Sequence, residues 1–197
     1  MNTKLLALSV ILSASVSTSA FALDGGQLNF AGLVSDNTCD MHVDGGAQDK
    51  DIQLSTASVA EVNTAGDVNL ATLGAKPKLF SITVDCSNSG MDLTAKPNAT
   101  MVMSSLFYSN SRGTLNNDTS INNPSSGVNL AIHNVKANGT FKQVKVNDPA
   151  DEYTATFNTS GVASWDFAAS YVTQNKTLVP VVAGFVKSNA AYTITYP

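Results

Sequence analysis

Alternation of apolar and polar residues, one for one, recurs along this 197-residue chain between segments rich in turn-forming residues. It is found in KLFSITVDC (78–86), VNLAIHNVKANGTFKQVKV (128–146), YTATFNTSGVASWDFAASYV (153–172) and NAAYTITYP (189–197). A period of two is typical of a β-strand with one face against a core. Many short strands with turn-rich connections predict an all-β protein and favour a β-sandwich.

Turn and helix signals refine this expectation. Asn138-Gly139 lies between two alternating runs and predicts a β-hairpin, and Ser160-Gly161 marks a second candidate hairpin. Residues 59–74 can hold a turn or two of helix, although Gly66 interrupts them. Residues 87–124 are rich in Asn, Ser, Gly and Thr, so we expect long surface loops there.

The first 22 residues have the pattern of a secretory signal peptide. A positive charge at Lys4 precedes an apolar run at residues 5–12, and a small-x-small site ends at Ala22. A membrane anchor needs about 20 apolar residues, more than this run supplies. We therefore predict that residues 1–22 are removed after Ala22 and that the rest of the chain is exported.

The chain has two cysteines, Cys39 and Cys86. In an exported protein such a pair favours a disulfide, worth about 4 kcal/mol in the chain-entropy model for a loop of this length. A zinc site is less favoured, because only His42 and His133 could complete it and no Cys-x-x-Cys pair is present. For both histidines, a solvent-facing or locally hydrogen-bonded side chain is favoured over a functional role.

Charge and motifs exclude several classes of function. The formal net charge of −4 argues against nucleic acid or an anionic membrane surface as a partner. The sequence has no Gly-x-Ser-x-Gly elbow, no His-Glu-x-x-His helix and no Gly-rich loop leading into a helix. A small exported enzyme therefore has no supporting set of residues, and we expect no catalytic residue, metal or cofactor.

The segment LDGGQLNFAGLVSDNTC (23–39) raises a separate question. Leu28, Phe30, Gly32 and Val34 share one parity, which predicts a strand with one apolar face. Alternation alone does not say what this strand pairs with. It fits an ordinary first strand of the same sheet, a loose tail, or a strand that pairs with another molecule.

Both ends of the chain together resemble a known family, the pilin subunits of chaperone–usher fimbriae of the type 1 group in Gram-negative bacteria. The resembling residues are Gly25-Gly26, LNFAGLVSDNTC (28–39) and Cys86, then GFVKSNAAYTITYP (184–197) with its penultimate Tyr196. Between about residues 45 and 160 the resemblance rests on Cys86 and strand patterning alone.

The resemblance implies an incomplete immunoglobulin-like β-sandwich that is completed by a donor strand from a neighbouring subunit. Residues 23–35 would be the N-terminal donor-strand extension and residues 36–197 the pilin domain. Leu28, Phe30 and Val34 would enter apolar pockets of the neighbour, and Gly32 a shallow one. Donor-strand complementation is an established case of strand addition to a sheet edge.

The resemblance also implies partners and a location. A periplasmic chaperone would cap the groove first and hold the carboxylate of Pro197 beside the strand of Tyr192, Ile194 and Tyr196. An outer-membrane usher would then catalyse exchange, so that the protein joins copies of itself and other pilins of the same fimbria at the cell surface.

The function implied is that of a structural subunit that polymerises by donor-strand exchange into adhesive surface filaments, as the major shaft subunit. The alternative is a minor or adaptor subunit, or one that binds a host-cell glycan or protein receptor directly. Both would carry the same two chain ends, so the sequence leaves this choice open.

Overall fold

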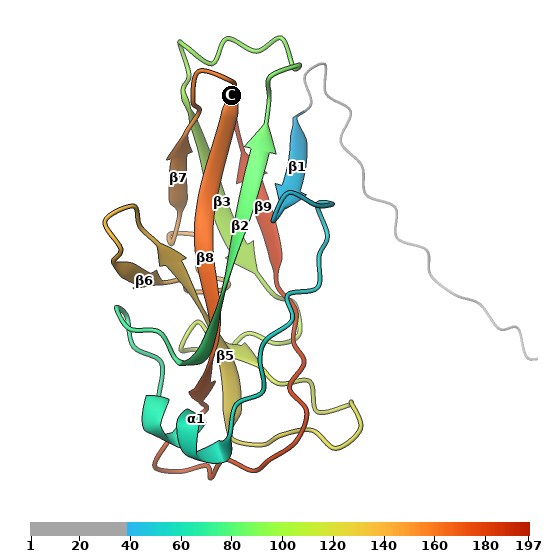
Figure 1. Cartoon of the computed structure of the whole chain (residues 1–197), viewed down its shortest axis with the longest axis vertical. Helices are drawn as coiled ribbons and strands as arrows, with labels where there is room; N and C mark the ends of the chain where they lie inside the picture. The colour runs from blue at the N-terminus through green and yellow to red at the C-terminus, as the bar shows by residue number, and fades with distance from the viewer. Residues whose placement is uncertain (1–38) are drawn as a thin grey trace, which may run out of the picture. The chain divides into compact units, whose positions relative to one another are not determined.

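The computed structural model describes residues 39–197, and these fold mainly into β-strands (Figure 1). The strands and the one helix of this part are β1 (Asp40–Val43), α1 (Val59–Ala65), β2 (Ala75–Asp85), β3 (Asn98–Ser104), β4 (Leu115–Asn116), β5 (Val128–Val135), β6 (Phe141–Gln143), β7 (Tyr153–Thr156), β8 (Val162–Thr173) and β9 (Ala191–Thr195). In the part of the chain that is described, no helix has the length and apolar character needed to cross a membrane.

The strands form two sheets in which neighbouring strands are antiparallel. The larger sheet has the order β1-β2-β8-β5-β4, and β6 also pairs with β5. The smaller sheet has the order β7-β3-β9. The prediction of an all-β sandwich is thus confirmed.

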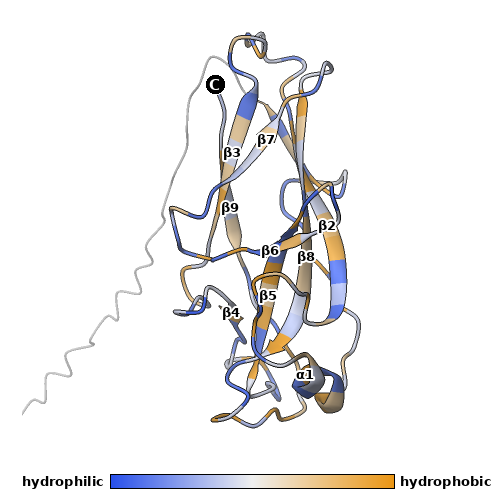
Figure 2. Cartoon of the chain, turned by 90° about the vertical axis from the view of Figure 1, so that its left-hand side faces the viewer, coloured by the Kyte–Doolittle hydropathy of each residue, from blue (hydrophilic) through white to orange (hydrophobic). Residues whose placement is uncertain are grey.

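The core lies between the two sheets. Phe167, Met101 and Val84 are fully buried there, and Trp165 donates a hydrogen bond from Nε1 to the carbonyl oxygen of Tyr153 at 2.8 Å. The Tyr153 and Phe167 rings pack edge to face, with centroids 6.0 Å apart. Figure 2 shows hydrophobic residues along the strands of both sheets, as expected for strands that each bury one face.

One predicted hairpin is confirmed and the other is wrong. The chain turns at Asn138-Gly139, where Gly139 adopts a φ of 77°, and β6 pairs with β5. At Ser160-Gly161 the chain also turns, but β7 joins the smaller sheet and β8 the larger one. The turn therefore connects the two sheets instead of closing a hairpin.

The region predicted as long surface loops contains a central strand. β3 is the middle strand of the smaller sheet, and its residues Ala99, Met101 and Met103 point into the core. The loop prediction for residues 87–124 is thus wrong for β3 and for the two-residue β4.

The predicted helical segment forms two turns and then ends. Ser58 caps α1, because its side chain accepts a hydrogen bond from the Glu61 N–H while Glu61 accepts one from the Ser58 N–H. Gly66 ends the helix with a φ of 75°. The reciprocal cap explains why so short a segment is helical.

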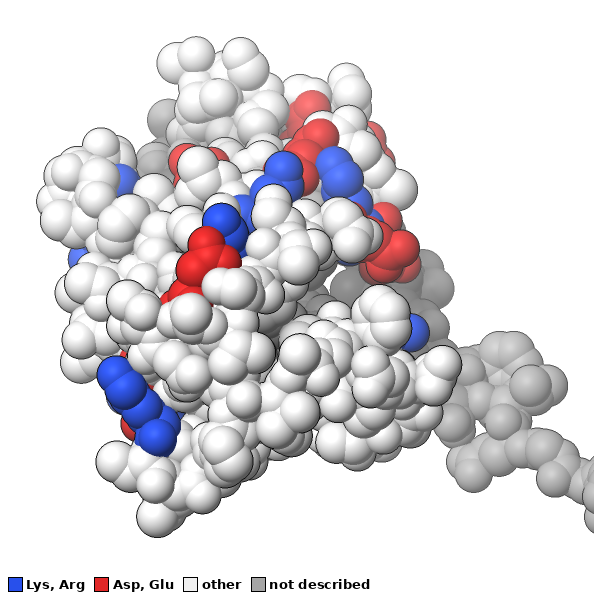
Figure 3. Space-filling view, turned by 60° about the horizontal axis from the view of Figure 1, so that its bottom comes forward, with Lys and Arg blue, Asp and Glu red and all other residues white. Residues whose placement is uncertain are grey.

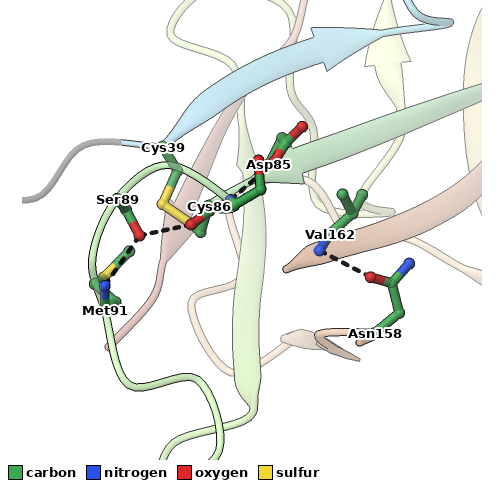
Figure 4. The surroundings of a disulfide bond; sticks show 8 residues. Cys39, Asp85, Cys86, Ser89, Met91, Asn158 and Val162 are labelled. Carbon is green, nitrogen blue, oxygen red and sulfur yellow. Dashed lines mark hydrogen bonds between the residues drawn. A yellow bond between two sulfur atoms is a disulfide. The ribbon is translucent and has the colours of Figure 1, made fainter. Parts of the chain in front are cut away.

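The predicted disulfide is present. Cys39 is bonded to Cys86 across a Cα–Cα distance of 4.4 Å (Figure 4). The bond ties the residue before β1 to the residue after β2, which are neighbouring strands. It therefore fixes one end of β1 at the edge of the larger sheet.

Candidate functional site: a groove between two sheet edges

One edge strand of the larger sheet, β1, and one edge strand of the smaller sheet, β9, lie on the same side of the core (Figure 1). Among the described strands, β1 pairs only with β2 and β9 pairs only with β3. The Tyr192 hydroxyl of β9 donates a hydrogen bond to the carbonyl oxygen of Gln48, in the segment that follows β1, at 2.7 Å. Burial, and then the nearby Asp49 carboxylate, raise the pKa of Tyr192 above its ordinary value.

A groove with a volume of about 800 Å³ opens between these edges. One wall is the segment 48–54 that follows β1, and the other is the segment 186–192 that leads into β9. The floor is made by side chains of the core, namely Phe80, Ile82, Met103, Leu115, Leu130, Ile132, Ala169 and Tyr171. The groove therefore reaches the core of the sandwich from one side, although most of these floor side chains are themselves buried.

A second hollow of about 340 Å³ continues the groove along β9. It shares Gln48, Asp49 and the segment 190–192 with the larger one and extends to Met41 and Ile194. The open side thus follows β9 along most of its length. A strand laid into it would meet the unpaired edge of β9 and the apolar floor together.

The C-terminal strand has the alternation that the sequence predicts. Tyr192, Ile194 and Tyr196 are half-buried and pack against the core, whereas Thr193 and Thr195 are exposed. Pro197 is exposed at the end of the chain. Of these predicted site residues, Tyr192 and Ile194 line the groove or its continuation, whereas Tyr196 and Pro197 line neither. Contact of all four with a chaperone stays a prediction.

The charged side chains of the groove lie at its rim. Lys50 forms an ion pair with Asp44 at 3.2 Å, and Lys187 lies on the opposite wall. On the face shown in Figure 3, acidic and basic side chains lie next to one another in mixed groups, and wide uncharged areas separate these groups. The floor is apolar and the rim is mixed in charge, an arrangement suited to an amphipathic strand.

Gly184 has a structural role that the sequence did not reveal. A Cβ atom at this position would lie 2.5 Å from the Ser125 nitrogen and 2.7 Å from the Asn123 oxygen. Only glycine allows the two backbones to approach this closely. The contact holds the chain in place two residues before Val186, where the groove wall begins.

Sequence comparison decides the family. The family model described as Fimbrial protein matches residues 28–197. The chain belongs to the fimbrial protein family. No curated protein matches it in sequence.

Two solved structures support the fold of this fimbrial protein. One comes from a chaperone–usher pilus studied for its rod uncoiling, with a TM-score of 0.58, 17% identity and coverage of 89% of this chain and 97% of that chain. The other is the P pilus rod subunit PapA, with a TM-score of 0.57, 14% identity and coverage of 81% and 99%. The immunoglobulin-like fold implied by the sequence is confirmed.

The remaining predicted site residues of the fimbrial protein are those of the predicted donor strand. Leu28, Phe30, Gly32 and Val34 fall outside the described residues, so their role as a donor strand stays a prediction. Within residues 39–197, no three His, Cys, Asp or Glu side chains lie close enough to hold a metal ion.

The two histidines differ from each other. His42 is locally bonded as expected, with Nδ1 2.8 Å from the Gly46 carbonyl oxygen. The same expectation is wrong for His133, which is fully buried in β5 and has Nε2 2.8 Å from the distant Asn69 carbonyl oxygen. Burial lowers the pKa of His133, so it is neutral at pH 7.

Proposed function

We propose that this fimbrial protein is a shaft subunit of a chaperone–usher fimbria, and that its groove takes residues 23–35 of another copy as the missing strand. The groove is the observation that carries the proposal, because its apolar floor lies between the outer edges of β1 and β9, which are unpaired among residues 39–197. An added strand needs a backbone partner and pockets for alternate side chains. β9 offers the first, and the floor from β2, β5 and β8 offers the second.

The energetics favour occupation of this groove. An open groove leaves apolar core and backbone groups exposed, which is an aggregation hazard. Burial of Leu28, Phe30 and Val34 contributes about 1.5–3 kcal/mol each, and each new backbone hydrogen bond about 1 kcal/mol. The sum is roughly 10 kcal/mol before entropic losses, enough for a lasting subunit contact.

The chain ends fit the same assembly route. Removal of residues 1–22 frees the extension at Leu23, and residues 36–38 connect it to Cys39 at the start of the folded part. A periplasmic chaperone would occupy the groove first and bind the carboxylate of Pro197, which follows β9. An outer-membrane usher would then exchange the chaperone for the extension of the next subunit.

A shaft role is supported by the rod origin of the two similar solved structures. The test is electron microscopy of cells that lack this gene and of the same cells supplied with the whole chain. We expect the deletion to remove all filaments and the whole chain to restore them. Filaments that persist in the deletion while adhesion is lost would indicate a minor, adaptor or receptor-binding subunit instead.

The donor role is tested separately with a chaperone-bound subunit and a synthetic peptide of residues 23–35. The peptide should release the chaperone and give a heat-stable complex, because it fills the groove. A Gly32→Leu peptide should exchange far more slowly, since a bulky side chain in a shallow pocket costs about 1–3 kcal/mol. A subunit that keeps its chaperone with both peptides would contradict the donor role.

A further inference from the structure

Asn117 is a buried polar residue that joins two segments of backbone. Its Nδ2 donates hydrogen bonds to the carbonyl oxygens of Ser125 at 2.8 Å and Phe185 at 3.0 Å, and its Oδ1 accepts one from the Lys187 N–H at 2.8 Å. Only 9% of the residue is exposed. Its carboxamide thus serves as a backbone partner for the segment 185–187.

This segment has one fully occupied edge. The Phe185 N–H donates to the Asn123 oxygen at 2.9 Å, and the Phe185 oxygen accepts from the Ser125 N–H at 2.8 Å. Two residues later, the Lys187 oxygen accepts from the Asp118 N–H at 2.7 Å. Asn117 bridges the point where the first backbone partner ends and the second begins.

Val186 lies between these two residues and lines the groove. In an extended chain, successive residues direct their backbone groups to opposite edges. Because the groups of Phe185 and Lys187 are used on one edge, those of Val186 face the other edge, toward the groove. Within residues 39–197, the Val186 N–H and C=O have no hydrogen-bond partner.

We propose that Asn117 is a positioning residue of the groove. It holds the segment 185–187 extended, so that Val186 offers its backbone and side chain to one end of the donor strand. The edge that can pair with a donor strand thereby extends from Ala191, where β9 starts, back to Val186. This inference rests on the proposed function, because the donor strand of another copy is the ligand.

The experiment uses the whole chain in its chaperone complex, with Asn117→Ala, Asn117→Asp and the matched control Asn129→Ala. Asn129 is also buried, at 3% exposed, but its Nδ2 donates to Thr114 Oγ1 at 3.0 Å, and neither residue lines the groove. Labelled peptides of residues 23–35 are added in excess, as the natural sequence and with Leu28→Ala or Val34→Ala.

We expect Asn117→Ala to weaken binding of the natural peptide at least about tenfold, which corresponds to the loss of one or two hydrogen bonds. Asn117→Asp keeps the acceptor for Lys187 and should lose binding as well, because it lacks the two donors. The control should bind as the wild type does. One of the two peptide substitutions, Leu28→Ala or Val34→Ala, should weaken binding less in the Asn117 variants than in the wild type. The other should weaken binding equally in both.

This end-specific coupling separates positioning from general stability, since a merely structural residue would weaken all three peptides equally. Hydrogen exchange at the Lys187 amide should also be faster in Asn117→Ala, which removes the acceptor of this N–H, than in Asn117→Asp, which keeps it. Equal losses with all peptides, or no loss, would overturn the role of Asn117. A wild-type subunit that binds no peptide would overturn the donor role itself.

Discussion

Replacing Gly184 with alanine should destabilise the domain beside the groove. The new Cβ would lie 2.5 Å from the Ser125 nitrogen, 2.6 Å from the Pro124 carbonyl carbon and 2.7 Å from the Asn123 oxygen. All three atoms belong to the backbone, so no side-chain rotation can relieve the contact. The two segments must therefore move apart.

The magnitude follows from the contacts that this movement breaks. Overpacking costs about 1–3 kcal/mol, and weakening the two hydrogen bonds between Phe185 and the segment 123–125 adds about 1 kcal/mol. A loss of about 2–4 kcal/mol lowers the melting temperature of a domain of this size by about 5–15 °C. Because Val186 moves with Phe185, affinity for a donor peptide should fall too.

The assay is thermal and urea unfolding of the purified protein, followed by circular dichroism, with Gly46→Ala as the matched control. At Gly46 the only neighbour of an added Cβ is the Val43 oxygen at 3.4 Å, an ordinary contact. This variant should melt within about 2 °C of the wild type, which corresponds to about 0.5–1 kcal/mol or less. If Gly184→Ala melts as the control does, the argument from close backbone approach is wrong.

Three further outcomes are expected. Mass spectrometry without reduction should find Cys39 bonded to Cys86, and removal of the bond should cost about 2–5 kcal/mol, whereas two alkylatable thiols would contradict it. Burial alone would raise the pKa of Asp151, but its hydrogen bonds, first among them that from Lys142, lower it below the usual value. The stability that the Asp151 carboxylate gives the folded state is therefore full above about pH 4 and is lost as pH falls through the lower folded-state pKa. Urea unfolding should therefore show a deficit for Asp151→Asn at pH 7 that shrinks toward pH 2, and a constant deficit would refute this. Tyr196→Ala should leave the subunit degraded or aggregated in the periplasm, and a normal filament yield would count against its role.

Much of the fold follows from local pattern. The period of two in NAAYTITYP (189–197) places Tyr192, Ile194 and Tyr196 on the core side of β9, as found. Asn138-Gly139 specifies the β5–β6 turn, because its residues suit a tight reversal between strands. These features depend on neighbours a few residues apart, so a sequence pattern captures them.

Other features depend on partners that are distant in the sequence. The sequence predicts a loop in place of β3, because the buried residues Ala99, Met101 and Met103 are small or flexible and lie in a polar region. β-branched and aromatic residues indicate strands more clearly. The turn at Ser160-Gly161 forms as predicted, but alternation reports which face of a strand is apolar and not which sheet it joins. Trp165 of β8, in the larger sheet, illustrates this, because its Nε1 donates a hydrogen bond to the Tyr153 carbonyl oxygen of β7, in the smaller sheet.

The groove could not be found from strand pattern at all. A strand beside a missing neighbour has the same alternation as a strand in a complete sandwich, because alternation describes faces and the groove is an open edge. The sequence instead shows an additional run of alternating apolar residues, Leu28, Phe30 and Val34. It precedes a folded part whose edges at β1 and β9 are unpaired among residues 39–197. In the proposed assembly, residues 23–35 of one copy fill the groove of another, which makes the contact heterologous. Such contacts, repeated between copies without closing, build a filament and not a compact oligomer.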